Sequence, residues 1–290
     1  MPRSSDATVL TPSLLADWKL PEPKEGKRAR GTVLVLGGSL PTPGAVLLAG
    51  TAALRTGAGR LQLAVAKEAS TALSIAVPEA KVVGLPATKA GSVRGDLPDA
   101  LLALVSKANV VVVGPGLDNG EEENTLLLRS VLKAIHVDAH VVLDANALHA
   151  LGATPALIEQ CHERCVLTPN LEEASSLLGR DLGDDLDDEA ITVAQKYGTT
   201  VSLYGHVAAP DGRCWREESA DAGLGTSGSG DVAAGIVAGF LSRDALPEQA
   251  ACWATHVHAM AGRRLGGPNG GVGYLARELA DEIPATIASI

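Results

Sequence analysis

The sequence predicts an α/β protein: a three-layer α/β/α sandwich in which helices cover both faces of one mostly parallel, doubly wound sheet. Three observations support this fold class. From residue 32 to about residue 205, short apolar strands alternate with helical segments, which is the order that builds a parallel sheet. Several strands are apolar throughout, as strands buried on both faces are. Aromatic residues make up only 2% of the chain, so Ala, Val and Leu must form the core.

The expected elements follow in order along the chain. Apolar, β-branched runs predict strands at residues 32–36, 61–65, 81–85, 109–113, 140–144 and 165–168. Helical segments are expected at residues 45–56, 68–76, 97–106, 121–135, 169–178 and 191–197. Residues 199–208 predict a strand, a bend and a second strand, and residues 213–217 return as its hairpin partner. Helices at residues 231–241, 247–265 and 275–282 complete the chain.

We expect one domain, residues 31–290, preceded by an N-terminal arm, residues 1–30. At 290 residues the chain is long enough to bury a full core without disulfides or metals. The arm is polar with scattered prolines, and it holds one short helix near residues 11–15 and a basic, solvated linker at residues 24–30. The acidic run at residues 181–189 is interpreted as a solvated loop and helix start.

Composition excludes several classes of partner. The formal charge of -10 argues against nucleic acid or an anionic membrane. No apolar run approaches the ~20 residues of a membrane span, and the N-terminus lacks the apolar core of a signal peptide, so the expected location is cytoplasmic. The four cysteines form no disulfide framework. Cys161 and Cys165 flank His162, but no second pair of zinc ligands lies nearby, so we interpret them as incidental thiols.

A glycine-rich stretch, Gly223 to Gly235, carries the clearest functional signal. It holds five glycines and one carboxylate in thirteen residues, and it runs directly into an apolar helix. Glycines let backbone N–H groups face a ligand without a Cβ in the way. The helix that follows points the positive end of its dipole at the same place. Backbone amides and a helix N-terminus together predict an anion site, most often one for phosphate.

Asp231 is the unexpected member of this stretch, because a carboxylate repels phosphate. One interpretation is a helix N-cap, which contributes about 1 kcal/mol to stability. The other is a general base that takes a proton from a substrate hydroxyl while glycine amides hold the charge that develops on a phosphoryl group. We favour the base, because Ser229 supplies a cap equally well and capping has no use for the additional glycines.

Other predicted strands end in residues that suit a ligand site. Gly37 and Gly38 follow one strand, Gly114 and Gly116 follow another, and Asp144 ends a third. Thr168, Pro169 and Asn170 follow a fourth strand. Carboxyl ends of parallel strands share one edge of the sheet, where α/β proteins bind ligands. The sequence therefore predicts a nucleotide or phosphate cleft at this edge, with Ala45 facing the ligand from the first turn of the helix at residues 45–56.

These motifs, taken together, resemble the nucleotide-dependent NAD(P)H-hydrate dehydratases of the ribokinase-like superfamily. The resemblance covers nearly the whole chain from about residue 31 and also includes a late His-x-x-Ala-Gly helix, residues 258–262. It implies a ribokinase-like domain and a hydro-lyase that converts hydrated NADH or NADPH, the 6-hydroxy adduct, back to NADH or NADPH. Phosphoryl transfer from ADP, in most bacterial members, or from ATP would be followed by elimination of phosphate.

The resemblance also implies roles for individual residues. Asp231 would be the catalytic base. Hydrated nicotinamide would be bound by Ala45, Gly116, Asn170 and Asp231. Nucleotide would be bound by Tyr204, Gly205, His206, Val207, Ala208, Gly228 and Gly230. Mg2+ is expected with a phosphoryl donor, with no dedicated metal cage and with Glu173 either as a water-mediated contact or as an ordinary first-turn acid. The family often forms homotetramers.

The chain departs from the family pattern at three positions. Bacterial members usually have His where this chain has Asn170, Lys where it has Tyr204, and Asp where it has Asn146. Two other functions stay open at this point. One is a small-molecule kinase of the same superfamily, acting on a sugar or a vitamin precursor. The other is a degenerate member that binds nucleotide without turnover.

Overall fold

One mixed sheet forms the centre of the molecule. The computed structural model describes residues 7–22, 24–267 and 271–290, and within them ten strands lie in the order β1-β10-β9-β8-β7-β6-β5-β2-β3-β4. Only β9 runs antiparallel to its neighbours β8 and β10. The strands are β1 (Thr8–Val9), β2 (Thr32–Leu36), β3 (Arg60–Ala66), β4 (Ala80–Leu85), β5 (Val110–Val113), β6 (His140–Leu143), β7 (Cys165–Leu167), β8 (Thr200–Leu203), β9 (His206–Ala208) and β10 (Cys214–Arg216).

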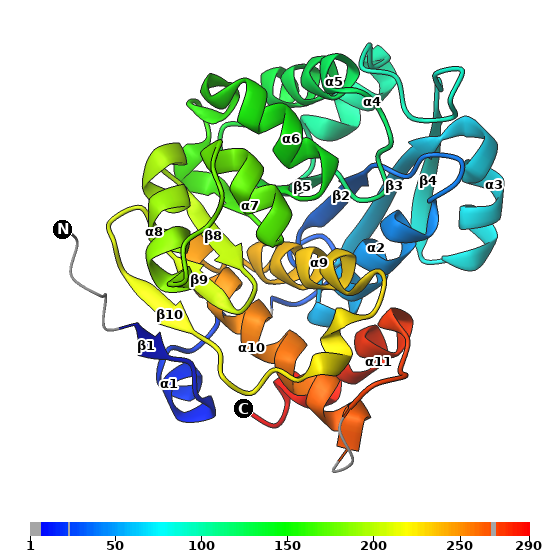
Figure 1. Cartoon of the computed structure of the whole chain (residues 1–290). Coiled ribbons are helices and arrows are strands. Elements are labelled where there is room, and N and C mark those ends of the chain that lie inside the picture. Colours follow the sequence, from blue (N-terminus) through cyan, green and yellow to red (C-terminus); the bar gives the residue numbers. More distant parts are fainter. Residues whose placement is uncertain (1–6, 23, 268–270) are drawn as a thin grey trace.

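Helices cover both faces of this sheet, as Figure 1 shows, which confirms the three-layer prediction. One face carries α2 (Gly44–Thr56), α3 (Lys67–Ala76), α9 (Ser229–Leu241), α10 (Pro247–Gly266) and α11 (Ala276–Ile287). The other carries α4 (Asp99–Val105), α5 (Glu121–Ala134), α6 (Asn146–Ala153), α7 (Leu171–Leu178) and α8 (Leu186–Tyr197). None of the described helices combines the length and the hydropathy needed to cross a membrane.

The apolar strands explain why the sheet is central. Successive side chains of a strand point to opposite faces, so Val33 and Val35 belong to the core on the face of α2 and α9, while Leu34 and Leu36 belong to the core on the face of α4 and α5. Every residue of β5, Val110–Val113, is completely buried. An alternating strand would leave one face in water. These all-apolar strands are stable only when both faces are covered.

The order of strands places a topological switch point between β2 and β5. From β2 the chain adds β3 and β4 on one side, and it then returns to add β5, β6, β7 and β8 on the other. In open α/β sheets the crevice outside the carboxyl ends of the strands at such a point is where ligands bind. The two strands at the switch point, β2 and β5, are followed directly by Gly37 and Gly114. These glycines begin the two glycine loops described in the sequence analysis.

One helix was not predicted, and one local expectation was wrong. Helix α6 begins at Asn146, two residues after Asp144, in a stretch for which no element was predicted. The acidic run is not solvated throughout, because Asp187 and Glu189 are only 3% and 6% exposed and α8 already begins at Leu186. Both carboxylates are buried against cations, Asp187 against Arg216 at 2.8 Å and Glu189 against Arg180 at 2.8 Å.

The N-terminal segment packs closely on the rest of the domain. Strand β1 adds to the edge of the sheet parallel to β10, and α1 (Pro12–Asp17) is capped by the Thr11 hydroxyl, as the short predicted helix requires. The Trp18 ring stacks on Trp215 with centroids 5.7 Å apart. Residues 1–6 and 23 of the predicted arm lie outside the described residues, and the boundary at residue 30 stays a prediction.

Replacing Leu15 in α1 tests how much this N-terminal packing contributes. Leu15 is completely buried, whereas Val9 in β1 is 37% exposed. We expect Leu15→Ala to lower the free energy of unfolding by about 2–4 kcal/mol, because it removes buried methylene groups and leaves a cavity. The control, Val9→Ala, should change it by less than about 1 kcal/mol. Urea unfolding measures both, and equal effects would contradict an N-terminal segment that is part of the core.

Candidate functional site

The loops after β2 and β5 meet at the switch point in close backbone contact. Gly37 lies so near the β5 loop that a Cβ on it would stand 2.0 Å from the Pro115 carbonyl oxygen. A Cβ on Gly114 would stand 1.7 Å from the carbonyl oxygen of Asp144, and the φ of Gly114 is +127°. Only glycine fits either position. These contacts fix the ends of β2, β5 and β6 against one another.

Hydrogen bonds then place Ala45 beside Gly116, as the sequence prediction requires. The N–H of Ser39 donates to the Gly116 carbonyl at 2.7 Å, and the Thr42 hydroxyl donates to the same oxygen at 2.9 Å. A Cβ on Gly116 would lie 2.9 Å from the Ala45 Cβ. Ala45 stands in the first turn of α2, so the helix N-terminus and the glycine loop form one continuous surface at the edge of the sheet.

Three carboxylates lie near one another at this edge: Asp144 after β6, Glu173 in the first turn of α7, and Asp231 in the first turn of α9. Burial, and then the charges of Asp231 and Glu173, raise the pKa of Asp144 to about 8. Burial, and then the charge of Glu173, raise the pKa of Asp231 to about 6. Because like charges at close range disfavour ionisation, the three groups share less than three negative charges near pH 7.

Asp144 is held by its neighbours. The Thr168 hydroxyl donates to its Oδ1 at 2.8 Å, and the N–H of Asp144 donates to the Val113 carbonyl in the ladder at 3.1 Å. A hydrogen bond from the Ala145 N–H acts against the rise in the pKa of the Asp144 carboxyl. The residue is only 5% exposed, so Asp144 is a buried, hydrogen-bonded carboxyl at the end of β6.

Asn170 and Glu173 start α7 as a capping box. The Asn170 Oδ1 accepts the Glu173 N–H at 2.9 Å, and a Glu173 carboxylate oxygen accepts the Asn170 N–H at 2.9 Å. Such reciprocal bonds satisfy two unpaired donors of a helix N-terminus. This geometry supports the plain interpretation of Glu173 as a first-turn acid. The amide nitrogen of the exposed Asn170 has no partner in the described part of the chain and is available to a ligand.

The glycine-rich stretch leaves backbone N–H groups at the start of α9 unpaired among the described residues, and we call this group of N–H donors the cradle. Gly228 takes the N-cap position of α9 with φ +85°, a conformation that favours glycine. In the described structure, the backbone N–H groups of Gly228, Gly230 and Asp231 have no hydrogen-bond partner. A Cβ on Gly230 would meet no atom within 4 Å. Unpaired donors at the start of an α-helix attract anions, and the open space at Gly230 lets one approach closely.

The structure excludes the N-cap interpretation of Asp231, and the base stays a prediction. The cap position belongs to Gly228, and no side chain caps α9. Neither Asp231 carboxylate oxygen accepts a hydrogen bond from a described residue. The side chain of an N-cap residue would accept a hydrogen bond from a backbone N–H group of the first turn. Asp231 is therefore a partly buried, unpaired carboxylate directed at the cradle, which is the arrangement a general base needs.

A partly exposed histidine of α10 bonds the cradle. The His258 Nε2 and the Ser229 hydroxyl share a hydrogen bond of 2.9 Å. Burial lowers the pKa of His258 to about 4, so the ring is neutral near pH 7 and adds no charge to the site. Ser229 lies between Gly228 and Gly230, so this bond fixes the first turn of α9 against α10.

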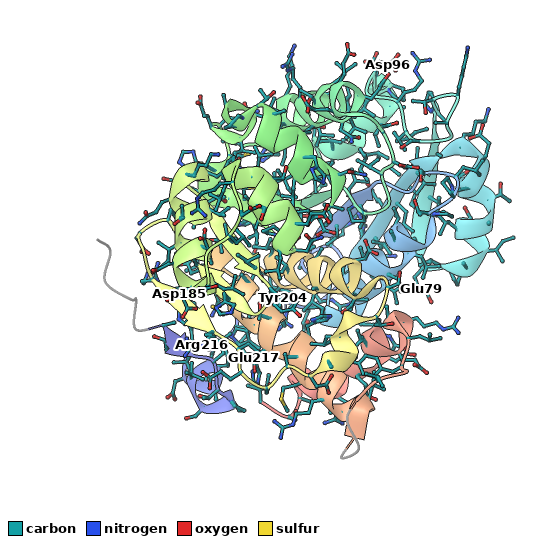
Figure 2. All side chains as sticks on the ribbon, viewed as in Figure 1. Glu79, Asp96, Asp185, Tyr204, Arg216 and Glu217 are labelled. Atoms are coloured by element: carbon teal, nitrogen blue, oxygen red, sulfur yellow. The ribbon has the colours of Figure 1, made fainter. Side chains whose placement is uncertain are left out.

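The predicted nucleotide segment forms a tight hairpin between β8 and β9. Tyr204 and Gly205 connect the strands, and both have positive φ, +47° and +91°, the pattern of a type I′ turn. The Tyr204 side chain is 72% exposed and stands at the tip in Figure 2. Val207 and Ala208 are completely buried and pair with strands on both sides. Their side chains are unavailable to a ligand, which leaves Tyr204 and Gly205 as the accessible part.

His206, the remaining member of this segment, belongs to a buried polar cluster that the sequence analysis missed. Its Nδ1 lies 2.6 Å from a carboxylate oxygen of Asp187, and the Arg216 guanidinium donates to the other oxygen at 2.8 Å. The partners are 19 and 29 residues from Asp187 in the chain. No local sequence pattern connects Asp187 with His206 and Arg216. Because Asp187 lies in an acidic run, its role in holding the hairpin could not be seen in the sequence.

The cysteines form no metal site. All four are buried and free, and burial raises the pKa of Cys161 to about 11 and of Cys214 to about 12. Across residues 7–22, 24–267 and 271–290, no three His, Cys, Asp or Glu side chains are grouped so that they could hold a metal ion.

Comparison with known proteins places the chain in a family. The family model for NAD(P)H-hydrate dehydratase matches residues 33–285. The ADP-dependent (S)-NAD(P)H-hydrate dehydratase of Xanthomonas campestris is 40% identical over 286 residues, which is 96% of this chain and 96% of that protein. This chain belongs to the NAD(P)H-hydrate dehydratase family. It spans about half the length of bifunctional NAD(P)H-hydrate repair enzymes, such as that of Moorella thermoacetica, which is 32% identical.

Solved structures agree with this placement. A ribokinase-like superfamily protein from Enterococcus faecalis matches with a TM-score of 0.82 over 100% of this chain and 98% of that one, at 22% identity, which establishes the ribokinase-like fold. The ADP/ATP-dependent NAD(P)H-hydrate dehydratase of Bacillus subtilis, crystallised with ATP and Mg2+, matches with a TM-score of 0.79 at 25% identity over 98% and 99% of the two chains. The family resemblance found in the sequence is confirmed.

The raised pKa of Asp144 makes a prediction about the stability of this family member. The folded protein keeps the proton on Asp144 up to about pH 8, whereas the unfolded chain releases it near pH 4. Stability contributed by this group is therefore lost as the pH rises from 4 to 8. Asp144→Asn has no proton to lose and still accepts the Thr168 bond, so it should be more stable than wild type at pH 8, by about 1 kcal/mol or more.

Urea unfolding at pH 5 and pH 8 measures this difference. The gain for Asp144→Asn should be larger at pH 8 than at pH 5. Asp184→Asn, at an exposed carboxylate, is the control and should show no such dependence. A gain that shrinks as the pH rises would contradict the buried, proton-holding Asp144.

Proposed function

We propose that this chain removes water from hydrated NADH and NADPH, with ADP as the phosphoryl donor. The observation that carries the proposal is the unpaired Asp231 carboxylate beside the unpaired N–H groups of Gly228 and Gly230. A carboxylate next to an anion cradle suits the transfer of a phosphoryl group to a hydroxyl, because the same site removes a proton and stabilises phosphate charge. Membership of the dehydratase family supports hydrated NAD(P)H as the bearer of that hydroxyl.

The reaction follows from the roles of these groups. Asp231 takes the proton from the ring hydroxyl as its oxygen attacks the terminal phosphorus of ADP, and AMP leaves. The N–H groups of the cradle hold the charge on the transferred phosphoryl oxygens. Phosphate, a far better leaving group than water, then departs from the ring, and the neighbouring ring carbon loses a proton to restore the double bond. The pKa of Asp231, about 6, leaves the base mostly ionised at pH 7.

The substrate ring is proposed to lie between the switch-point loops and the cradle. Ala45 and Gly116 offer a flat surface without long side chains, and the exposed Asn170 offers an amide N–H to the substrate. This arrangement brings the residues assigned by the family resemblance to one edge of the sheet. A homotetramer in the cytoplasm stays a prediction.

The residues at this edge suit Mg2+ that arrives with the nucleotide. The charges of Asp231 and Glu173 raise the pKa of Asp144, and the charge of Glu173 raises the pKa of Asp231, so a cation beside these carboxylates would offset their repulsion. Mg2+ usually keeps several waters and binds through one or two carboxylates and the phosphates of the substrate. Glu173 would hold it through water, and the ion would screen the charge of the transferred phosphoryl group. ADP as donor is supported by the ADP-dependent relative that is 40% identical.

The first test of the function is a spectroscopic assay of the wild type and Asp231→Asn. Hydrated NADH and Mg2+ are mixed with ADP or with ATP, and the returning absorbance of the reduced nicotinamide is followed. We expect return with ADP, and a rate that falls below pH 6, because only the ionised carboxylate accepts a proton. Asp231→Asn should lose about 10²–10⁴-fold in rate. Asp99→Asn, which alters another first-turn acid, should keep the wild-type rate.

Other outcomes of this assay point elsewhere. No return with either nucleotide, in a protein whose melting temperature still rises with ADP, would overturn the dehydratase and favour a small-molecule kinase or a binding protein without turnover. If the absorbance of the reduced nicotinamide still returns with Asp231→Asn, Asp231 is not the catalytic base, although the chain is still a dehydratase.

Gly230→Ala separates the cradle from the fold. No atom lies within 4 Å of the Cβ position, and alanine favours a helix more than glycine does, so we expect stability to rise by up to about 1 kcal/mol. The new methyl group would stand where the phosphates approach, and losing one hydrogen bond to a charged group should weaken ADP binding by roughly tenfold or more. Calorimetric titration with ADP measures this effect. Gly120→Ala, also in open space, should bind ADP like the wild type.

A further inference from the structure

A pocket that the proposed function does not use lies where the N-terminal segment meets α10. Its volume is about 340 Å³. Residues around the start of α1, the segment that leaves β10, and α10 all line it, among them Leu10, Pro12, Glu217, His256, Met260 and Arg263. Figure 2 labels Glu217 next to Arg216, the last residue of β10. None of the lining residues is among those proposed to bind the substrate ring, the nucleotide or Mg2+.

His256 brings an unpaired polar atom to this pocket. The residue is only 2% exposed. Its Nδ1 lies 2.5 Å from a carboxylate oxygen of Glu217, whereas its Nε2 is buried and has no hydrogen-bond partner within the described residues. Buried polar atoms of folded proteins are nearly always paired, and leaving one unpaired is costly. Because the His256 ring lines the pocket, a molecule bound there is in a position to supply the missing partner.

The surroundings of Glu217 favour Nε2 as a hydrogen-bond donor. The Glu217 side chain is 1% exposed, and its other carboxylate oxygen accepts the N–H and the hydroxyl of Ser219 at 2.6 and 2.5 Å. Burial alone would raise the pKa of Glu217, but the hydrogen bonds from His256 and Ser219 outweigh burial and lower the pKa. Glu217 is therefore an ionised, buried carboxylate, which needs a positive partner. His256 meets that need as the imidazolium, in which both ring nitrogens donate.

Arg263 adds a second cation to the pocket. It is exposed and follows His256 by roughly two helical turns of α10. Arg264, its neighbour, pairs with Glu282 at 2.9 Å, while Arg263 forms no ion pair with a described residue. Glu218, the other acid of the pocket, is already paired with a cation of β10 at 3.1 Å. Within the described part of the chain, the charge that this pocket leaves for a ligand is therefore positive.

The remaining wall of the pocket is apolar. Leu10 is 3% exposed, and Pro12 and Met260 add further apolar surface. A pocket of this size with an apolar wall and few polar groups is typical of small-molecule sites. A carboxylate bound by imidazolium and guanidinium N–H groups makes charge-assisted hydrogen bonds, and an apolar body would cover the wall. A phosphate suits the pocket less, because its second negative charge would stand near Glu217 and Glu218.

We propose that this pocket binds a small organic monocarboxylate. The carboxylate lies at the His256 Nε2 and the Arg263 guanidinium, and the apolar body lies against Leu10, Pro12 and Met260. This site is distinct from the substrate and nucleotide sites proposed above, and it does not depend on the dehydratase reaction. It gives the N-terminal segment a part in ligand binding, because Leu10 and Pro12 form part of the wall.

The probe for this site is benzoate, a monocarboxylate with an apolar ring, and its neutral counterpart is benzamide. Saturation-transfer NMR on the full-length protein measures the binding of each, because it detects weak ligands through their own signals. We expect the wild type to bind benzoate about fivefold or more tightly than benzamide, because only benzoate has a charge for the two cations. Saturating ADP should leave benzoate binding unchanged, because ADP is proposed to occupy the cradle.

Two variants locate the bound benzoate. His256→Asn keeps an amide near the position of Nδ1, so that Glu217 retains a donor, and it removes Nε2. Arg263→Gln removes the exposed charge, and Arg264→Gln, one residue further along α10, is its matched control. We expect benzoate affinity to fall about tenfold in His256→Asn and about threefold in Arg263→Gln, and to stay within about twofold of the wild type in Arg264→Gln.

Several results would overturn the site. Benzoate that binds no better than benzamide, or that does not bind, would exclude a carboxylate site. Displacement of benzoate by ADP would place benzoate in the cradle. Benzoate affinity that is unchanged in both His256→Asn and Arg263→Gln, or that falls equally in Arg263→Gln and Arg264→Gln, would place benzoate outside this pocket. If the melting temperature shows that His256→Asn does not fold, the comparison of Arg263→Gln with Arg264→Gln still decides.

Discussion

The candidate site depends on how closely three backbone segments approach at the carboxyl edge of the sheet. The loop after β2 touches the loop after β5 at Gly37, and that loop touches the end of β6 at Gly114, both at distances that no Cβ tolerates. Each segment continues a buried strand, so the parallel register, such as Val113 opposite Leu143, sets where it ends. The positions of Asp144 and Ala45 are therefore consequences of sheet geometry, and a side chain at either glycine would displace them together.

Features encoded by neighbouring residues were predictable from the sequence. All-apolar strands, glycine loops at their ends and a glycine-rich helix start are local patterns, and they correctly predicted the fold. They also placed Asp231 in the first turn of a helix, where the structure shows that it is not the N-cap. The hairpin after β8 was predicted in the same way. These signals work because backbone approach and strand burial select residue types directly, so composition and position alone reveal them.

Features that depend on distant partners were not predictable. Asp187 lies in an acidic run that suggests a solvated segment, yet it is buried because His206 and Arg216 reach it from β9 and β10. A buried carboxylate needs such partners, and no residue next to Asp187 in the sequence indicates which partners it has. The raised pKa of Asp144 has the same origin, since it depends on burial and on carboxylates that only the folded chain brings near. Helix α6 was missed because its small apolar stretch lacks a distinct cap.

The structure gives a physical reason for a carboxylate inside an anion cradle. Burial and the charge of Glu173 favour the protonated form of Asp231, so its ionised form is a stronger base than an exposed aspartate. In the proposed reaction, Asp231 accepts a proton from the substrate, and its negative charge disappears as the phosphoryl charge forms beside it. The repulsion that makes Asp231 unfavourable before the reaction is thereby relieved during it. The N–H groups of Gly228 and Gly230 favour the phosphoryl anion at the same moment, so both effects stabilise the transition state more than the bound substrates.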